Sequence, residues 1–356
     1  MEKNKDKISV IIPCYNVQKY VMRCFDSIYS QTYGFENLEV IFIDDLSTDN
    51  TWSILEMLQN KYSENVISVK MKNKGMCGGT RNLGMDICTG KYIMFLDADD
   101  CIHPNTIDIL YNKSLEKDFD IVQCEVVMFC DDKPKYTQIE DVKAREFNLA
   151  NIDERKKLIL AWSGGFSICV WAKLYSSEFL KKNCIRFIEN INFEDGHFSF
   201  LCVLLAKKYC KIDSPLLYYF QNSNGIMAGQ QSLEKLRDSA KYTNTLIEEI
   251  KHRGLDNGVV KECKYEVQIA IFWRFYFCTM NKLNWIYQEE KKFYRDFVLK
   301  NNFFEGILSS PYITETIGEE FLNYMSYLKK AKRFLKTFNE TFDAILVYEI
   351  SPVLQI

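Results

Sequence analysis

Three acidic side chains, Asp97, Asp99 and Asp100, come directly after the apolar run 92–96. The run predicts a buried strand, and because strand residues two apart point to the same side, Asp97 and Asp99 are expected to converge just beyond its carboxyl end. Carboxylates about 4 Å apart repel each other by roughly 4 kcal/mol at an effective dielectric constant of about 20, and a divalent cation removes that cost. Oxygen ligands suit Mg²⁺ or Mn²⁺, and substrate phosphates commonly complete a Mg²⁺ shell. An acidic turn that only caps the helix expected from Pro104 is an equally weighted alternative.

A second acidic pair, Glu194 and Asp195, stands immediately before an apolar run that predicts a helix from about Gly196. Acids at a helix start complement the helix dipole and often serve only as caps. An aspartate at such a junction can also face a cleft while the helix behind it fixes its position, as a general base requires. Both interpretations are open from the residues alone.

A glycine-bearing loop at 72–84 leads into another predicted helix. Its glycines are Gly75, Gly78, Gly79 and Gly84. This spacing is a poor match to G-x-G-x-x-G, and the loop follows the third strand instead of the first, so a dinucleotide-binding Rossmann domain is disfavoured. Backbone N–H groups of the loop, with Lys74 and Arg81, can instead meet a diphosphate. The open alternative is a plain helix start whose glycines serve turn geometry.

Apolar runs precede each of these groups and predict an α/β fold with a mostly parallel sheet flanked by helices. The expected strands are residues 8–12, 38–43, 66–70, 92–96, 120–129 and 211–220. The first runs are continuous and β-branched, which is typical of strands buried on both faces, and helical spacing at 17–30 and 52–62 separates them. Strand ends would therefore gather the acids at one edge of the sheet.

The pattern changes to long helical stretches beyond residues 221–231, which predicts a catalytic domain at 1–225 and a helical region at 226–356. Residues 321–346 carry apolar side chains at spacings of three, four and seven, with basic residues largely off that stripe. The stripe is expected to pack on the catalytic domain or a second subunit, or to contact an anionic membrane surface. Residues 131–146 are polar and predict a loop at the rim of the site.

Composition excludes several classes of protein. The 47% hydrophobic content permits a sizeable core, and a net charge of −3 with interspersed signs argues against nucleic-acid binding. The 13 cysteines are scattered and show no CxxC pair, which predicts buried thiols in a reducing compartment. The polar start and the absence of an 18-residue apolar stretch predict a cytoplasmic protein, at most peripheral at the inner face of the membrane.

Five stretches together resemble the GT-A-fold family 2 glycosyltransferases, a large inverting family that builds bacterial polysaccharides. The stretches are SVIIPCYN at 9–16, EVIFIDDLSTDNT at 39–51, GGTRNLGMDICTGKYIMFLDADD at 78–100, VWAKLYSSEFL at 170–180 and FEDGHF at 193–198. They occur in the family's order and their joint occurrence is specific. The resemblance covers residues 7–222 and implies a nucleotide-sugar donor, most simply a UDP-sugar, and a saccharide acceptor.

The resemblance also implies roles for individual residues. The expected donor-binding residues are Pro13, Tyr15, Asn16, Asp45, Arg81, Asn82, Asp97 and Ala98, with Lys74 added from the loop. Asp45 would contact the base, and Arg81 and Asn82 would face the nucleotide or diphosphate. Asp97, Ala98 and Asp99 correspond to the DxD motif, in which Asp99 is the better candidate for metal contact and Asp97 would hold ribose or share the ion.

Asp195 corresponds to the general base, and Glu194 would support the acceptor hydroxyl or the loop. His197 is a candidate to replace a metal-binding histidine that many relatives carry later in the chain, although a helix-face histidine is the more ordinary interpretation. Trp171 and Lys173 would form part of the acceptor wall.

The chemistry expected from these groups is a single displacement. A metal would stabilise charge on the departing diphosphate, and one base would take the proton of the attacking hydroxyl, which inverts the anomeric centre. Three alternatives remain open from the sequence: a nucleotidyltransferase, a non-catalytic scaffold that binds sugar nucleotides, and a dehydrogenase that binds NAD. The first would need a basic loop after the first strand, where only Lys19 is available.

Overall fold

The structure of the chain is a computed structural model. It describes residues 5–130, 133–139, 142–160, 166–221, 233–255 and 258–262. The chain divides into two compact units, residues 1–254 and 255–356. The predicted boundary segment falls almost wholly outside the described residues, and so does the predicted apolar stripe at 321–346.

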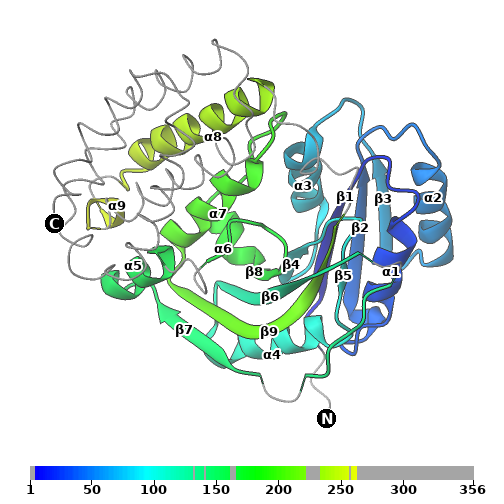
Figure 1. The fold of residues 1–356 in the computed structure, drawn as a ribbon, viewed down its shortest axis with the longest axis horizontal. Helices are drawn as coiled ribbons and strands as arrows, with labels where there is room; N and C mark the ends of the chain where they lie inside the picture. Colours follow the sequence, from blue (N-terminus) through cyan, green and yellow to red (C-terminus); the bar gives the residue numbers. More distant parts are fainter. Residues whose placement is uncertain are drawn as a thin grey trace, which may run out of the picture. The chain divides into compact units, whose positions relative to one another are not determined.

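Parallel strands form one half of the central sheet (Figure 1). They are β1 (Ile8–Cys14), β2 (Leu38–Asp44), β3 (Val66–Lys70) and β4 (Tyr92–Phe95), in the order β3-β2-β1-β4. Every residue of β2 is buried, as expected for a strand covered on both faces. Because the strands run the same way, their carboxyl ends share one edge of the sheet, where Cys14 lies beside Asp44.

The other half of the sheet is mixed. It contains β5 (Cys101–Ile102), β6 (Ile121–Phe129), β7 (Ala144–Asn148), β8 (Lys173–Ser176) and β9 (Lys208–Phe220). β8 joins β4 and β6 in antiparallel fashion, β6 pairs with β9 in parallel, and β5 and β7 are antiparallel to β9. The α/β class is confirmed, and parallel pairing dominates only in the β3-β2-β1-β4 half, because an apolar run does not encode strand direction.

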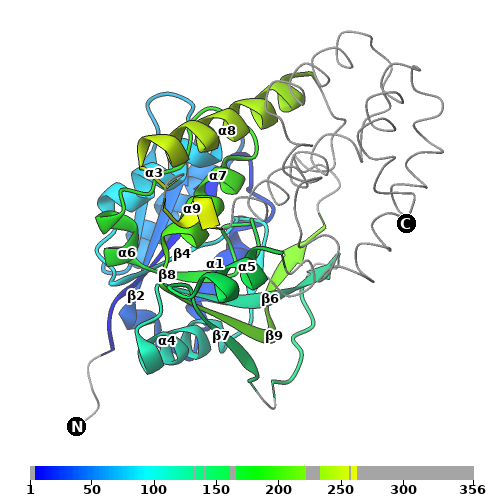
Figure 2. The ribbon, with the colours of Figure 1, turned by 90° about the vertical axis from the view of Figure 1, so that its left-hand side faces the viewer.

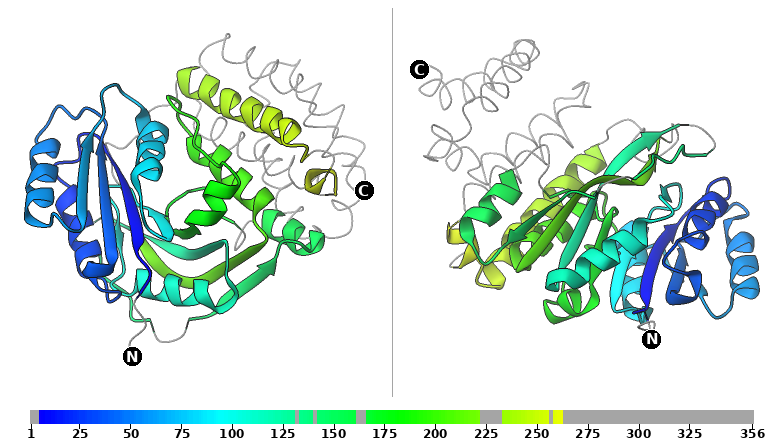
Figure 3. Two further views of the ribbon diagram at one scale, coloured as in Figure 1. Left: turned by 180° about the vertical axis from the view of Figure 1, so that it is seen from behind. Right: turned by 90° about the horizontal axis from the view of Figure 1, so that it is seen from below.

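Helices of the first unit cover both faces of this sheet (Figures 1 and 3). The helices of this unit are α1 (Val21–Tyr29), the 3₁₀ helix η1 (Phe35–Asn37), α2 (Thr51–Lys61), α3 (Met76–Ile87), α4 (Thr106–Lys117), α5 (Ile152–Leu160), α6 (Ser177–Lys182), α7 (Glu194–Leu205) and α8 (Leu233–His252). The described part of the second unit contains α9 (Val259–Glu262). α3 packs closely on β1, since a Cβ added at Gly84 would overlap Ile11. No helix in the described part of the chain is both long and apolar enough to cross a bilayer.

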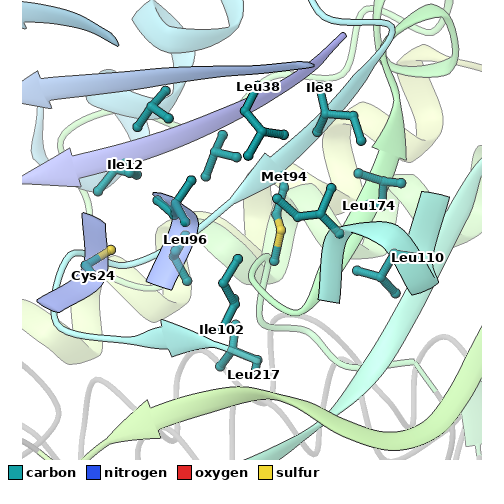
Figure 4. Packing of buried hydrophobic residues seen from close by; sticks show 14 of the residues in the cluster. Ile8, Ile12, Cys24, Leu38, Met94, Leu96, Ile102, Leu110, Leu174 and Leu217 are labelled. Atoms are coloured by element: carbon teal, nitrogen blue, oxygen red, sulfur yellow. The ribbon is translucent and has the colours of Figure 1, made fainter. Parts of the chain in front are cut away.

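Alternate residues of the central strands build the core on the face that α1, α2 and α4 cover. Ile8, Val10 and Ile12 of β1 point to this face and are fully buried. Figure 4 shows part of the cluster, including Cys24 of α1 and Leu110 of α4. Each fully buried aliphatic side chain stabilises the fold by about 1.5–3 kcal/mol, so this cluster fixes the strands whose ends carry the acids.

α8 packs on α7 within the first unit (Figure 2). A Cβ added at Gly196 of α7 would lie 3.1 Å from the ring of Tyr242 on α8. α8 therefore supports the helix that carries the second acidic pair, although its residues follow the predicted domain boundary. The predicted rim loop at 131–146 is shorter than expected, because its last residues belong to β7.

Candidate functional site

The turn directly beyond β4 alternates in exposure. Asp97 and Asp99 are partly exposed, whereas Ala98 and Asp100 are buried. The N–H group of Asp100 donates to the Asp97 carbonyl at 3.0 Å and closes the turn. Asp100 also accepts a hydrogen bond from the N–H group of Phe220 at 2.8 Å. Asp97 and Asp99 are thus the accessible pair, as the strand alternation predicts, and Asp100 serves the fold.

Arg81 of α3 joins the two acidic groups. Its side chain is only 4% exposed. Its Nη2 donates to Asp97 Oδ1 at 2.8 Å, and its Nη1 makes a short ion pair with Glu194 Oε1. This bridge places the end of β4 and the start of α7 in one site. Arg81 was expected to face a diphosphate, and in the structure its two terminal nitrogens are engaged by carboxylates.

Proton affinities in this bridge follow from burial and charge. Although burial opposes the shift, Asp97 and Glu194 raise the pKa of Arg81 above its ordinary value, so the guanidinium stays charged. Burial raises the pKa of Glu194 to about 7, with Arg81 opposing the shift and Asp195 reinforcing it. Because one guanidinium faces several acids, the negative charge on Glu194 is only partly compensated.

Asp195 lies beside Glu194 in the first turn of α7. The helix begins earlier than the expected Gly196, because Phe193 adopts a left-handed φ of 68° as the N-cap residue and Glu194 is already helical. The Asp195 side chain is partly exposed, whereas Glu194 is 8% exposed. Asp195 is therefore the more accessible of the two acids, and the helix behind it is held by the core.

Asp45 holds the main chain at the start of α3. Its Oδ1 accepts from the N–H group of Gly75 at 2.7 Å, and its Oδ2 accepts from that of Met76 at 3.0 Å. A carboxylate of the protein therefore occupies two of the N–H groups that a diphosphate could use at this helix start. A base contact by Asp45 stays a prediction.

Gly78 is explained by close packing. A Cβ at this position would overlap the carbonyl oxygen of Ile188, so only glycine lets this segment lie against α3. Asn82 fixes the same segment, since its Nδ2 donates to the Phe187 carbonyl at 3.0 Å and its Oδ1 accepts from the Phe187 N–H group at 3.0 Å. Asn82 is 4% exposed, and the structure gives it these partners where a nucleotide contact was expected.

Comparison with known proteins decides the family. The model of Glycosyl transferase family 2 matches residues 9–182, which include Arg81 and Asp97. Glycosyltransferase GlyG of Streptococcus pneumoniae serotype 4 is 30% identical over 259 residues, which cover 71% of this chain and 84% of GlyG. The chain is a family 2 glycosyltransferase. It is therefore a transferase enzyme, as the resemblance of its motifs predicted.

Two further proteins are similar to this glycosyltransferase. The poly(ribitol-phosphate) beta-glucosyltransferase of Bacillus spizizenii is 32% identical over 217 residues, which cover 60% of this chain and 32% of that protein. The crystal structure of S. aureus TarS 1-349 in complex with UDP-GlcNAc has a TM-score of 0.64 at 21% identity and covers 85% of this chain and 81% of that chain. The second likeness confirms the GT-A fold.

Four predicted donor-site residues of the glycosyltransferase lie at the carboxyl end of β1 and in the loop before α3. Pro13 pairs with β2 inside the sheet. Tyr15 is 45% exposed, and Lys74 Nζ donates to its hydroxyl at 3.0 Å and lies 4.3 Å from its ring centre. Asn16 accepts from the N–H group of Thr48 at 2.8 Å, which ties the loops after β1 and β2 together. Tyr15 and Lys74 thus form an accessible pair at the sheet edge.

His197 lies on the side of α7 that faces α8. Its Nε2 lies 2.6 Å from Glu249 Oε2, and its side chain is 4% exposed. The structure therefore gives His197 a carboxylate partner of the protein itself, where a metal was the candidate partner. We leave His197 out of the proposed metal site for this reason.

Trp171 and Lys173 have different surroundings. Trp171 stacks on Tyr219 with ring centres 5.6 Å apart and an interplanar angle of 23°. Lys173 is 2% exposed, and its Nζ donates to the carbonyls of Ser167 and, at 2.6 Å, Cys169. Burial lowers the pKa of Lys173 to about 8. Lys173 therefore holds the main chain of the segment before Trp171 and is too buried to form part of an acceptor-binding surface.

The donor atoms near Asp99 fit a metal that also binds substrate. Within the ranges that the structure describes, no group of three or more His, Cys, Asp or Glu side chains could hold an ion. Asp97 and Asp99 supply two carboxylates, and one oxygen of Asp97 already accepts from Arg81. Such a pair suits Mg²⁺ or Mn²⁺, which bind one or two carboxylates and take further oxygens from phosphates.

Sequence reasoning missed Arg23 of α1. Its Nη2 donates to the carbonyl oxygen of Asp99 at 2.8 Å. The residue follows Tyr20 by one helical turn and lies at the edge of the apolar stripe of α1, where an arginine is unusual. An arginine at that position could have indicated a functional side chain. Nothing in the sequence, however, identifies the acidic turn as the partner of Arg23.

Proposed function

We propose that this glycosyltransferase moves a sugar from a nucleotide-sugar donor, a UDP-sugar, to a hydroxyl group of a glycan or of a lipid- or protein-linked saccharide, with inversion at the anomeric carbon. The Arg81 bridge carries the proposal. It sets Asp97, on the predicted donor side, next to Glu194 and the predicted base Asp195. Transfer requires the donor and the acceptor to meet between those two groups.

The relatives support the donor class and the acceptor class. S. aureus TarS has been crystallised with UDP-GlcNAc, and the B. spizizenii relative is named for glucosyl transfer involving poly(ribitol-phosphate). For this chain we therefore favour a UDP-sugar and a glycan or polyol-phosphate acceptor.

Donor binding would use the accessible pair at the sheet edge. The exposed ring of Tyr15 offers a flat apolar face to a base, and the Lys74 ammonium beside it offers a positive charge to a phosphate. Asp45 would accept a hydrogen bond from the base with lone pairs that its bonds to the Gly75 and Met76 N–H groups do not use.

Asp99, with Asp97, would hold a Mn²⁺ or Mg²⁺ ion together with the diphosphate of the donor. Bound there, the ion would act as a Lewis acid that stabilises negative charge on the leaving diphosphate. The protein's own contribution is the positioning of the two carboxylates at the end of a buried strand, which the Arg81 hydrogen bond to Asp97 fixes.

Asp195 would act as the base. Glu194 is buried and paired with Arg81, so it is poorly placed to accept a proton from a bound hydroxyl. Asp195 is partly exposed and stands on the first turn of a well-packed helix. It can take the proton late in the displacement, when bond formation has made the hydroxyl acidic. Attack from the face opposite the departing diphosphate gives inversion.

A screen of sugar nucleotides tests this function. We expect one donor to release UDP in a reaction that requires Mn²⁺ or Mg²⁺, first by slow hydrolysis and faster when the acceptor is present. A scaffold protein would bind without turnover, and a nucleotidyltransferase would release pyrophosphate or consume a nucleoside triphosphate. Either of those results would refute the proposal.

A further inference from the structure

Arg23 and its neighbour anchor the main chain of the acidic turn to α1. Arg23 Nη2 donates to the Asp99 carbonyl at 2.8 Å. The thiol of Cys24 lies 3.7 Å from the Asp97 carbonyl oxygen, which makes a weak additional hydrogen bond. α1 therefore holds two carbonyl groups of the turn, one at each of the accessible aspartates.

Aromatic rings from three separate segments surround the Arg23 guanidinium. Its central carbon lies 4.3 Å from the ring centre of Phe220, 4.9 Å from that of Phe129 and 5.7 Å from that of Tyr20. The planar guanidinium is attracted to aromatic faces and stacks on them, which an ammonium group does less well. The rings leave the group little freedom, so its hydrogen bond to Asp99 has a fixed direction.

Phe220 closes this arrangement on the other side. Its N–H group donates to Asp100 Oδ1 at 2.8 Å, while its ring contacts Arg23. Asp100 is fully buried. One aromatic residue at the end of β9 therefore contacts both the arginine and the buried acid of the turn.

Two arginines thus compensate the charge of one turn. Arg81 pairs with Asp97, and Arg23 places a second positive charge beside the Asp99 carbonyl group. Close carboxylates repel each other in the absence of a cation, so the turn needs such support to keep its shape before a metal arrives. A carboxylate that binds metal must be held by surrounding groups to within about 0.5 Å.

We infer that Arg23 is a positioning residue that holds the Asp99 carbonyl, and through it the Asp99 carboxylate, in the geometry that binds a divalent cation together with a nucleoside diphosphate. The inference rests on the proposed function. Arg23 touches neither the sugar nor the base in this scheme. The loss of its side chain should therefore reduce the gain in UDP affinity that the metal provides and leave UDP affinity without metal unchanged.

Binding measurements on the full chain test the inference. Titration of UDP with and without Mn²⁺ gives the metal-dependent gain in affinity, and electron paramagnetic resonance reports Mn²⁺ binding directly. For Arg23→Met we expect the gain to fall about tenfold or more, while UDP affinity without metal stays within about twofold. Arg23→Lys keeps the positive charge but loses the planar group that stacks on the rings. Its metal-dependent gain in UDP affinity should lie between those of Arg23→Met and wild type.

A matched control is Arg145→Met, because Arg145 is an exposed arginine of β7 that forms an ion pair with Asp213. Arg145→Met should show the same metal-dependent gain in UDP affinity as wild type. An unchanged metal-dependent gain in a folded Arg23→Met protein would refute the inference, as would a reduction of equal size in the control. If Arg23→Met does not fold, as judged by circular dichroism, Arg23→Lys decides. If wild type itself shows no metal-dependent UDP binding, the proposed function fails, and the role of Arg23 fails with it.

Discussion

His197 Nε2 and Glu249 Oε2 lie 2.6 Å apart and join α7 to α8. Arg253 donates to the second oxygen of Glu249, with its Nε at 2.8 Å. The hydrogen bond from His197 is the main cause that lowers the pKa of Glu249 to about 2, and burial opposes it while Arg253 assists. This pair holds α8 against the helix that carries Asp195.

Stability should therefore depend on Glu249 at acidic pH. Because the pKa of Glu249 falls from 4.5 to about 2 on folding, its ionised form stabilises the protein above about pH 4.5, and this contribution is lost as the pH falls toward 2. Glu249→Gln should lower the free energy of unfolding at pH 7 by about 1–3 kcal/mol and by much less below pH 3. Urea unfolding at both pH values measures this. Glu248→Gln, an exposed neighbour on α8, should have almost no effect.

Gly78 and Gly79 should respond differently to alanine. A Cβ at Gly78 would overlap the Ile188 carbonyl, whereas the nearest atom to a Cβ at Gly79 is 3.7 Å away. Gly78→Ala should cost about 1–3 kcal/mol by overpacking, and Gly79→Ala should be neutral or stabilise by up to about 1 kcal/mol. Thermal unfolding measures both. A large loss of UDP affinity in a stable Gly79→Ala protein would instead favour a diphosphate site at this loop.

Arg81→Met should be strongly destabilising, since it leaves the acids of the bridge without their counter-charge. Removing one partner of a buried ion pair costs about 3–5 kcal/mol. The double variant Arg81→Met/Glu194→Gln should recover part of that loss, because the uncompensated Glu194 charge is gone. Chemical denaturation of both variants measures the coupling. Equal stabilities of the single and double variants would contradict the bridge.

Asp195→Asn should reduce sugar transfer by about 10²-fold or more, as is typical when a general base is lost, while UDP affinity and folding stay near wild type. The substitution preserves shape and removes the basic lone pair. Steady-state transfer kinetics and UDP titration check this. Near-normal transfer by Asp195→Asn, or a loss confined to Glu194→Gln, would mean that the base lies elsewhere.

Metal removal and substitution should distinguish the role of Asp99 in transfer from that of Asp100. Excess EDTA and Asp99→Ala should each abolish transfer, because the diphosphate would lose its cation. Asp100→Asn should cost less activity, since Asp100 is buried and bonded to Phe220 and does not face the accessible side of the turn. Transfer rates across a Mn²⁺ titration distinguish the two. Full turnover in EDTA would refute the metal requirement.

Local sequence patterns were sufficient for the strands β1 to β4 and for the positions of the acids, but they did not predict the strands β5, β7 and β8. The continuous apolar run of β2 and the alternation after β4 are properties of neighbouring residues, so they predicted a strand and two aspartates on the same side of the chain without any long-range information. Joint motifs likewise predicted the family. The start of α7 was placed slightly late, because a left-handed residue such as Phe193 has no mark in the sequence.

The tertiary structure alone decided which partner each polar side chain has. Asp45 binds the main chain of Gly75, Asn82 binds that of Phe187, and Arg81 joins Asp97 to Glu194 across a long stretch of sequence. Periodicity specifies which face a residue takes but not which distant segment covers that face. That choice depends on how the sheet is ordered and on where glycine lets two backbones approach, as Gly78 does for Ile188.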